Sequence, residues 1–166
     1  DLVRSLTLID PVFFSAAKDA GRAEFDQHMG LHGAFYALLD KGDYRAAAKE
    51  FSLLWGAEAD WDDLPSAQQD YQAERIMMIR AGGESVLGLG PDYIPLGKVA
   101  AIKVPVLLIE GEKTDPIIAA VQDEIERVLP QARRVVVPEA GHMVPITHAA
   151  AVARELRRLF GLPPSD

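Results

Sequence analysis

The hydrophobic pattern of the chain predicts three short β-strands. Largely apolar runs extend from Val3 to Pro11, from Val104 to Gly111 and from Arg133 to Pro138. Most of their apolar residues follow one another instead of alternating with polar ones, which is typical of strands buried on both faces of a sheet. Each run ends at Pro or Gly, residues that interrupt strands. We therefore expect three strands of a buried, parallel sheet.

The long segment between the first two strands has helical periodicity instead. From Phe13 to about Lys98, apolar residues recur at helical spacing between polar breaks. One helix contains Phe35–Leu39, a second covers Tyr44–Trp55 and a third covers Pro65–Arg80. The stretch Gly82–Gly97 is rich in Gly and Pro and predicts a loop after the third helix. This segment is expected to form a helical insertion.

The last third of the chain alternates strands with helices. Two apolar stripes predict a helix that ends at Pro130 and a final helix that ends before Gly161; the stripes are Val121, Ile125, Val128 and Leu129, then Val152, Leu156, Leu159 and Phe160. This order requires parallel strands joined by right-handed crossovers. The predicted fold class is α/β, with a core strand in 1–11, a helical insertion in 12–98 and an α/β part in 99–166.

The composition fits one folded domain. The chain has 166 residues, of which 49% are hydrophobic, enough for a packed core. It has 17 Lys and Arg against 25 Asp and Glu, and this acidic balance argues against a nucleic-acid partner, which requires a basic face. Because there is no Cys, disulfides, thiolate metal ligands and thiol nucleophiles are excluded.

No segment of the sequence is a candidate for membrane insertion. The longest apolar runs are the length of a strand, far below the roughly 18 to 20 residues that span a bilayer. No cationic segment leads into an apolar run and a cleavage site, as in a signal peptide. We therefore expect a soluble, cytoplasmic protein without a membrane partner. The chain starts at Asp1, shortly before a predicted strand, and further chain is expected upstream.

Three polar residues follow the predicted strands at their carboxyl ends. Asp10 follows the first strand, Asp115 lies in the loop after the second and His142 lies in the loop after the third. Ligands of open parallel sheets bind at this edge. A carboxylate and an imidazole from neighbouring loops suit general-base catalysis, because the carboxylate fixes the ring tautomer and stabilises the imidazolium.

These segments resemble the α/β-hydrolase superfamily. Val104–Pro116 matches the penultimate strand and its acid loop, and Ala140–Pro145 matches the histidine loop. Val3–Pro11 is similar to the strand that follows the nucleophile-bearing helix, and the helical insertion is similar to the cap. The resemblance implies the carboxyl-terminal part of a hydrolase fold, with Asp115 as the acid and His142 as the base of a catalytic triad.

The chain departs from the family at the nucleophile. The family carries its Ser on a G-x-S-x-G turn that precedes the acid and the His. No serine here has that context; the serines are Ser5, Ser15, Ser52, Ser66, Ser85 and Ser165. We therefore expect the N-terminal part of the same hydrolase, in the same polypeptide or as a separate fragment, to supply the nucleophile and the oxyanion hole. The 166 residues alone are expected to be inactive.

Further residues are candidates for the site. Asp10 is an alternative acid, because some members of the superfamily take the acid from the earlier strand. Aromatic and sulfur-containing side chains near the predicted edge or in the insertion are candidates for an apolar substrate pocket: Phe13, Phe14, Trp55 and Met143. His28 and His32 have the spacing of helical metal ligands, but no Glu lies between them. We expect neither a metal nor a cofactor.

The expected function is hydrolysis of a carboxylic ester or a related small acyl substrate through an upstream Ser, with Asp115 and His142. One alternative is an epoxide hydrolase or haloalkane dehalogenase with an upstream Asp nucleophile. Another alternative is a hydrolase-like scaffold that binds a ligand or a protein without catalysis. A small-molecule substrate is the expected partner, and homo-oligomerisation stays open.

Overall fold

The computed structural model describes residues 2–55 and 60–163. The chain divides into two compact units. The first, the sheet unit, combines residues 1–12 with 96–166, and the second, the helical unit, contains residues 13–95.

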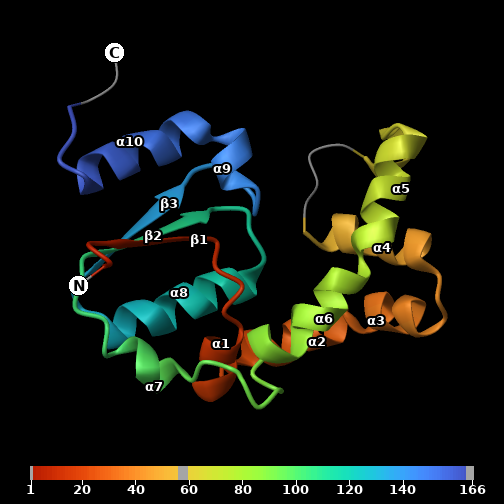
Figure 1. Cartoon of the computed structure of the whole chain (residues 1–166), viewed down its shortest axis with the longest axis horizontal. Coiled ribbons are helices and arrows are strands. Elements are labelled where there is room, and N and C mark those ends of the chain that lie inside the picture. The colour runs from red at the N-terminus through yellow and green to blue at the C-terminus, as the bar shows by residue number, and fades with distance from the viewer. Residues whose placement is uncertain (1, 56–59, 164–166) are drawn as a thin grey trace. The chain divides into compact units, whose positions relative to one another are not determined.

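A parallel three-stranded sheet forms the centre of the sheet unit (Figure 1). Its strands are β1 (Leu6–Ile9), β2 (Val106–Gly111) and β3 (Ala132–Val137), in the order β1-β2-β3. Leu6 pairs with Val106, which pairs with Ala132 on its other side. Every residue of the central strand β2 is buried, as its continuous apolar run predicts. The predicted parallel sheet is confirmed.

Helices cover both faces of this sheet. The long helix α8 (Pro116–Val128) lies on one face with α7 (Leu96–Val99) beside it, and α9 (Val144–Thr147) and α10 (Ala149–Leu159) lie on the other (Figure 1). Because strand side chains alternate between faces, Leu107 and Ile109 point to the same side. There they share a buried cluster with residues of the third strand, the following loop and α9–α10, namely Val137, Ala140, Val144 and Val152.

The helical unit contains seven helical segments among its described residues: α1 (Ser15–Asp19), α2 (Ala23–Leu31), α3 (Gly33–Asp40), α4 (Tyr44–Leu54), the 3-10 turn η1 (Trp61–Asp63), α5 (Ser66–Arg75) and α6 (Met77–Val86). They surround a core of their own, formed by Phe35, Leu39, Ala47, Ala48, Trp61 and Ile76. The Asp43 side chain caps α4 by accepting a hydrogen bond from the Ala46 amide, at 3.1 Å.

Two expectations for the helical unit are wrong. The predicted helix over 65–80 is interrupted at Ile76, whose buried side chain belongs to the core, and α6 continues to Val86 through the stretch predicted as a loop. Gly83 lies inside α6, where a Cβ would stand 3.4 Å from the Tyr36 hydroxyl, so here glycine serves close packing. The chain leaves α6 at Gly88, whose φ of +67° suits glycine.

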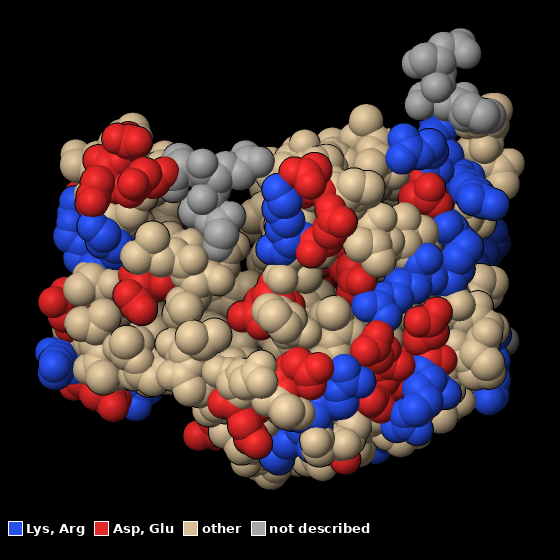
Figure 2. All heavy atoms as spheres, turned by 180° about the vertical axis from the view of Figure 1, so that it is seen from behind, with Lys and Arg blue, Asp and Glu red and all other residues tan. Residues whose placement is uncertain are grey.

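Charge is distributed unevenly over the described surface. Lys and Arg side chains gather on the face of the sheet unit that includes α10, which carries Arg154, Arg157 and Arg158 (Figure 2). By sequence, residues 13–95 contain 7 Lys and Arg against 14 Asp and Glu, so most of the net negative charge belongs to the helical unit. None of the described helices has the length and hydropathy needed to cross a lipid bilayer.

Candidate active site

Three loops meet at the carboxyl end of the sheet, where they join Asp10 to His142. Nδ1 of His142 lies 3.1 Å from Oδ2 of Asp10, although 132 residues separate them in sequence. The hydroxyl of Thr114, from the loop after β2, donates to the same Oδ2 at 2.6 Å. The backbone N–H of Gly111 donates to Oδ1 at 3.0 Å. Each of the three strands therefore delivers one part of this cluster.

Asp10 is held rigidly at the end of β1. Its side chain is 1% exposed, and its backbone N–H still donates to the carbonyl of Ile109, at 2.8 Å, as a continuation of the strand pairing. Its φ of +43° is left-handed, a conformation that Asp tolerates better than most residues with a side chain. The sharp turn lets the carboxylate point across the end of β2.

Gly111 allows the histidine loop to close over β2. A Cβ at this position would overlap the carbonyl groups of Ala140 and Gly141, so only glycine fits. The loop is fastened by the N–H of Lys113, which donates to the carbonyl of Ala140 at 2.8 Å. Another bond runs from the N–H of Glu112 to the carbonyl of Val137, at 3.0 Å. The backbone therefore fixes the loop that carries the imidazole.

His142 has the geometry of a general base. A carboxylate only accepts hydrogen bonds, so the proton between the two side chains belongs to Nδ1 of the imidazole. Nε2 then carries the lone pair that can take a proton from a reacting group. The His142 side chain is 22% exposed, whereas the Asp10 carboxylate is almost completely buried. The pair can accept a proton at Nε2 and stabilise the resulting imidazolium.

Asp115, the acid expected from the sequence, has a structural contact of its own. Its Oδ1 accepts a hydrogen bond from the Ile117 amide at 2.9 Å, and it caps α8 just before Pro116. The carboxylate that the structure places on Nδ1 of His142 is Asp10, the alternative acid of the sequence analysis. A triad role for Asp115 stays a prediction.

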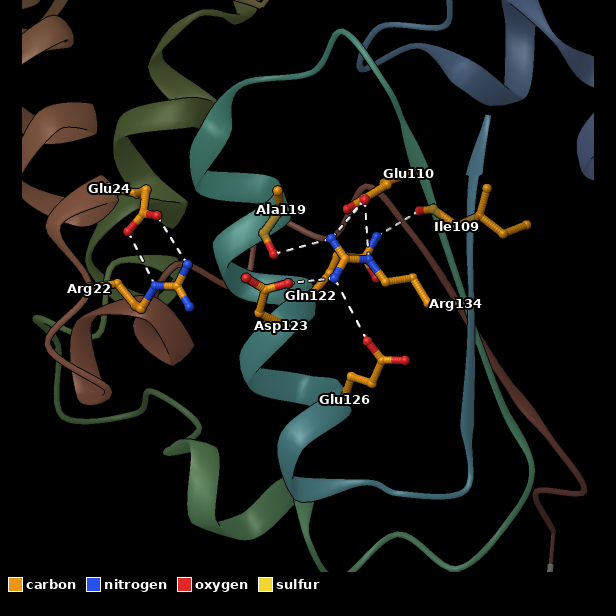
Figure 3. Close-up of polar contacts among 9 residues, drawn as sticks. All are labelled: Arg22, Glu24, Ile109, Glu110, Ala119, Gln122, Asp123, Glu126 and Arg134. Carbon is orange, nitrogen blue, oxygen red and sulfur yellow. Dashed lines mark hydrogen bonds and ion pairs between the residues drawn. The ribbon is translucent and has the colours of Figure 1, made fainter. Parts of the chain in front are cut away.

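A buried ion cluster lies on the α8 face of the sheet (Figure 3). Nε and Nη2 of Arg134 donate to Oε1 of Glu110 at 3.1 and 2.7 Å, and Nη1 donates to Asp123 of α8 at 2.5 Å. Burial raises the pKa of Glu110, against the opposing effect of Arg134, and the charge of Asp10 raises it further. Because Glu110 precedes Gly111, the cluster anchors the strand end that holds Asp10.

Sequence reasoning missed this cluster, although it left a signal. Glu110 is the only charged residue of β2, and Arg134 lies within the next strand, β3. A charged side chain in a buried, otherwise apolar strand requires a counter-ion, and the neighbouring strand of the sheet is the nearest element that can supply one.

The four predicted pocket residues are divided between the two units. In the helical unit, the rings of Phe14 and Trp55 stack with centroids 5.9 Å apart, and Phe14 is buried. Phe13 is half-buried and also belongs to the helical unit, whereas Met143 precedes α9 in the sheet unit and is 41% exposed. Their pocket role stays a prediction.

Sequence reasoning also missed a set of rings that contact one another in the helical unit. His28 lies 4.5 Å from Phe14 and 3.9 Å from His32, measured between ring centroids. Both histidines are buried, and Nδ1 of His32 lies 2.9 Å from the carbonyl of His28. Among the residues that the structure describes, no group of three or more His, Asp or Glu side chains is arranged to hold a metal ion.

Comparison with protein families gives a match along nearly the whole chain. Residues 1–155 match the family described as the alpha/beta hydrolase family. The chain is also 34% identical to a protein of Bacillus subtilis (strain 168) that is provisionally named 2-succinyl-6-hydroxy-2,4-cyclohexadiene-1-carboxylate synthase. The matched part is 68% of this chain and 43% of the relative, so the chain spans less than half the length of that protein.

Solved structures share the fold. A bromoperoxidase from Bacillus anthracis superposes with a TM-score of 0.63 at 14% identity, covering 97% of this chain and 59% of that protein. An alpha/beta hydrolase from Sphaerobacter thermophilus DSM 20745 superposes with a TM-score of 0.56 at 21% identity, covering 95% of this chain and 58% of that protein. The predicted carboxyl-terminal part of this fold is confirmed.

Proposed function

The chain belongs to the alpha/beta hydrolase family, and we propose that it supplies the base and the acid of a serine-dependent acyl hydrolase. His142 is the base and Asp10 is the acid that orients it. The nucleophilic serine and the oxyanion hole come from sequence outside these 166 residues, because no serine here lies on a G-x-S-x-G turn. The proposed substrate is a carboxylic ester or a related small acyl compound.

The contact between Asp10 and His142 carries this proposal. In the first half-reaction, Nε2 of His142 takes the proton of the serine hydroxyl while the serine oxygen attacks the ester carbonyl. The imidazolium then gives this proton to the departing alcohol, and an acyl-enzyme remains. In the second half-reaction, His142 takes a proton from water while the water oxygen attacks the acyl group, and the imidazolium then returns this proton to the serine oxygen as the carboxylic acid leaves. Asp10 stabilises the imidazolium in both halves.

Activity of the full-length protein that contains this chain provides the test. Hydrolysis of p-nitrophenyl esters of increasing acyl length is measured for the wild type and for His142→Ala and Asp10→Asn. We expect kcat/KM to fall by about 10⁶-fold in His142→Ala and about 10⁴-fold in Asp10→Asn, the sizes typical for loss of a triad base and of its orienting acid. His148→Ala is a matched control at the start of α10 and should remain within about twofold of the wild type. Full activity in His142→Ala contradicts the proposal.

The nucleophile needs a separate experiment. A serine nucleophile reacts with a fluorophosphonate, and intact mass spectrometry then shows one added phosphonyl group. An aspartate nucleophile instead forms an alkyl-enzyme ester with an epoxide or a haloalkane, and this adduct accumulates when His142 is replaced by Ala. Absence of both adducts favours the non-catalytic binding scaffold.

The Bacillus subtilis relative supports a second candidate function. At 34% identity, the chain is similar to a protein named for the synthesis of 2-succinyl-6-hydroxy-2,4-cyclohexadiene-1-carboxylate. For this second function we propose that the same imidazole acts as a base toward the substrate itself. Chromatographic detection of that product, formed by the wild type and lost in His142→Ala, distinguishes this function from ester hydrolysis.

A further inference from the structure

The carboxylate of Asp10 is shared between two side-chain donors. Its Oδ2 accepts from the hydroxyl of Thr114 at 2.6 Å and from Nδ1 of His142 at 3.1 Å. Its Oδ1 accepts from the backbone N–H of Gly111. The side chain is almost completely buried, so water does not compete freely for these lone pairs. The hydroxyl and the imidazole therefore compete for the electron density of one oxygen atom.

Thr114 has a fixed position because it lies in a tight turn. Its backbone N–H donates to the carbonyl of Gly111 at 3.3 Å, which closes the turn that follows β2. The same turn thus delivers a donor to each oxygen of Asp10, the Gly111 amide to Oδ1 and the Thr114 hydroxyl to Oδ2. Two donors on opposite oxygens prevent rotation of the carboxylate.

We propose that Thr114 is a positioning residue, whose hydroxyl holds the Asp10 carboxylate toward His142 and limits how strongly that carboxylate favours the imidazolium. This inference rests on the proposed roles of Asp10 and His142. A hydrogen bond from Thr114 disperses part of the negative charge of Oδ2, so the charged imidazole is stabilised less than by a carboxylate without this donor. Thr114 therefore adjusts the proton affinity of the base as well as its orientation.

Removal of the hydroxyl has a defined electrostatic consequence. In Thr114→Val the shape of the side chain is nearly kept, but Oδ2 loses one donor and more of its charge acts on the imidazolium. The titration midpoint of the His142 ring should rise by about half a pH unit to one unit, which corresponds to the net contribution of one ordinary hydrogen bond because the lost bond acts on the ring only through Asp10. The acid limb of the pH profile of kcat/KM should move upward by the same amount.

The surrounding charges stay the same in this comparison. The other charged or titratable groups of the strand ends and loops that carry Asp10, Thr114 and His142 are Glu110, Glu112, Lys113, Asp115, Glu139 and His148. Lys113 and Glu139 form an exposed ion pair at 2.5 Å. None of these groups changes in Thr114→Val, so a shift of the His142 midpoint reports the lost hydroxyl.

The experiment is an NMR titration of the full-length protein labelled at histidine. The ring signals are followed against pH in the wild type, Thr114→Val, Thr114→Ser and the matched control Thr147→Val. The control removes a hydroxyl that contacts His148 at 2.7 Å instead of Asp10. We expect an upward shift for His142 in Thr114→Val, a midpoint near the wild type in Thr114→Ser, and no change for His142 in Thr147→Val.

Two outcomes separate this inference from the proposed function. If the His142 midpoint is unchanged in Thr114→Val but changes in Asp10→Asn, Thr114 has no positioning role and the Asp10–His142 pair stands. If Asp10→Asn leaves the midpoint unchanged, the pair itself is refuted. In a background of Asp10→Asn, Thr114→Val should cause no further shift. Thr114→Ala provides the same reading if the valine variant does not fold.

Discussion

Replacing Arg134 by Met should destabilise the sheet unit, and the loss should be larger at a pH where the Glu110 carboxyl group is ionised. The side chains of Arg134 and Glu110 are 17% and 5% exposed, and two N–H groups of Arg134 bind the same carboxylate oxygen. Met keeps much of the apolar volume but leaves a buried carboxylate without its counter-ion. Breaking such a pair costs about 3 to 5 kcal/mol. We expect the lower end, about 3 kcal/mol, because Asp123 and Glu126 are partly exposed and regain water.

The loss should depend on pH in a defined direction. Burial already raises the pKa of Glu110, and removal of Arg134 takes away the interaction that opposes this rise. A carboxyl group with a higher pKa in the folded than in the unfolded state stabilises the fold when protonated, and this contribution disappears as pH rises through the folded value. The difference in stability between the variant and the wild type should therefore be smaller near pH 5 than at pH 8. Each unit by which the substitution further raises the pKa of Glu110 contributes about 1.4 kcal/mol to this change.

Urea denaturation followed by circular dichroism measures the free energy of unfolding, and amide hydrogen exchange of β2 and β3 reports on the sheet unit. The double variant Arg134→Met with Glu110→Gln should recover at least half of the loss, because it removes the buried charge. Arg127→Met is the control, since Arg127 forms a more exposed ion pair with Glu124 along α8 and should cost about 1 kcal/mol or less. A loss below about 1 kcal/mol in Arg134→Met, or one that is independent of pH, refutes this reasoning.

Three further substitutions test the local geometry. Gly111→Ala should lower stability by about 2 kcal/mol or more and shift the His142 NMR signals, because the new Cβ overlaps the histidine loop; normal stability and unshifted signals argue against that close approach. Asp115→Ala should lower the free energy of unfolding by about 0.5 to 2 kcal/mol in urea denaturation, because α8 loses the cap that accepts from the Ile117 amide. Asp115→Asn should keep most of this stability, because Asn also caps helices. If Asp115→Asn reduces kcat/KM as strongly as Asp10→Asn, Asp115 is the acid that the sequence predicts. Gly88→Ala should destabilise the helical unit by about 1 kcal/mol or more in thermal unfolding, because φ is +67° and a Cβ would stand 2.8 Å from Cβ of Ser15; an unchanged midpoint contradicts this.

The central strand and the parallel topology could be predicted because burial on both faces leaves a plain pattern in β2, whereas the expected full burial of the other two strands is wrong: β1 and most of β3 are only partly buried. Val106 to Ile109 are all apolar and all buried, and an uninterrupted apolar segment of this length is typical of a strand covered on both faces. The glycines of the helical unit were less informative about where its helices end. A single sequence does not show whether glycine permits a positive φ, as at Gly88, or a close approach inside a helix, as at Gly83.

The sequence predicted at which edge of the sheet the candidate residues lie, but not which carboxylate contacts His142. Asp10, Asp115 and His142 all follow strands, and strand order brings their loops to one edge. The contact between Asp10 and His142 depends on a left-handed φ at Asp10 and on the closure of the histidine loop over Gly111. Neither feature leaves a periodic signal, because the first is the conformation of a single residue and the second is a close approach between residues about 30 positions apart in sequence.

The position of the helical unit in the sequence has a consequence for how such a protein can diversify. It is inserted between Asp10 and β2 and packs around its own core, whereas the bonds among Asp10, Gly111, Thr114 and His142 all lie inside the sheet unit. Insertions, deletions or a complete exchange within residues 13–95 can therefore accumulate without altering those bonds. The sheet unit can thus conserve this contact network while the helical unit diverges.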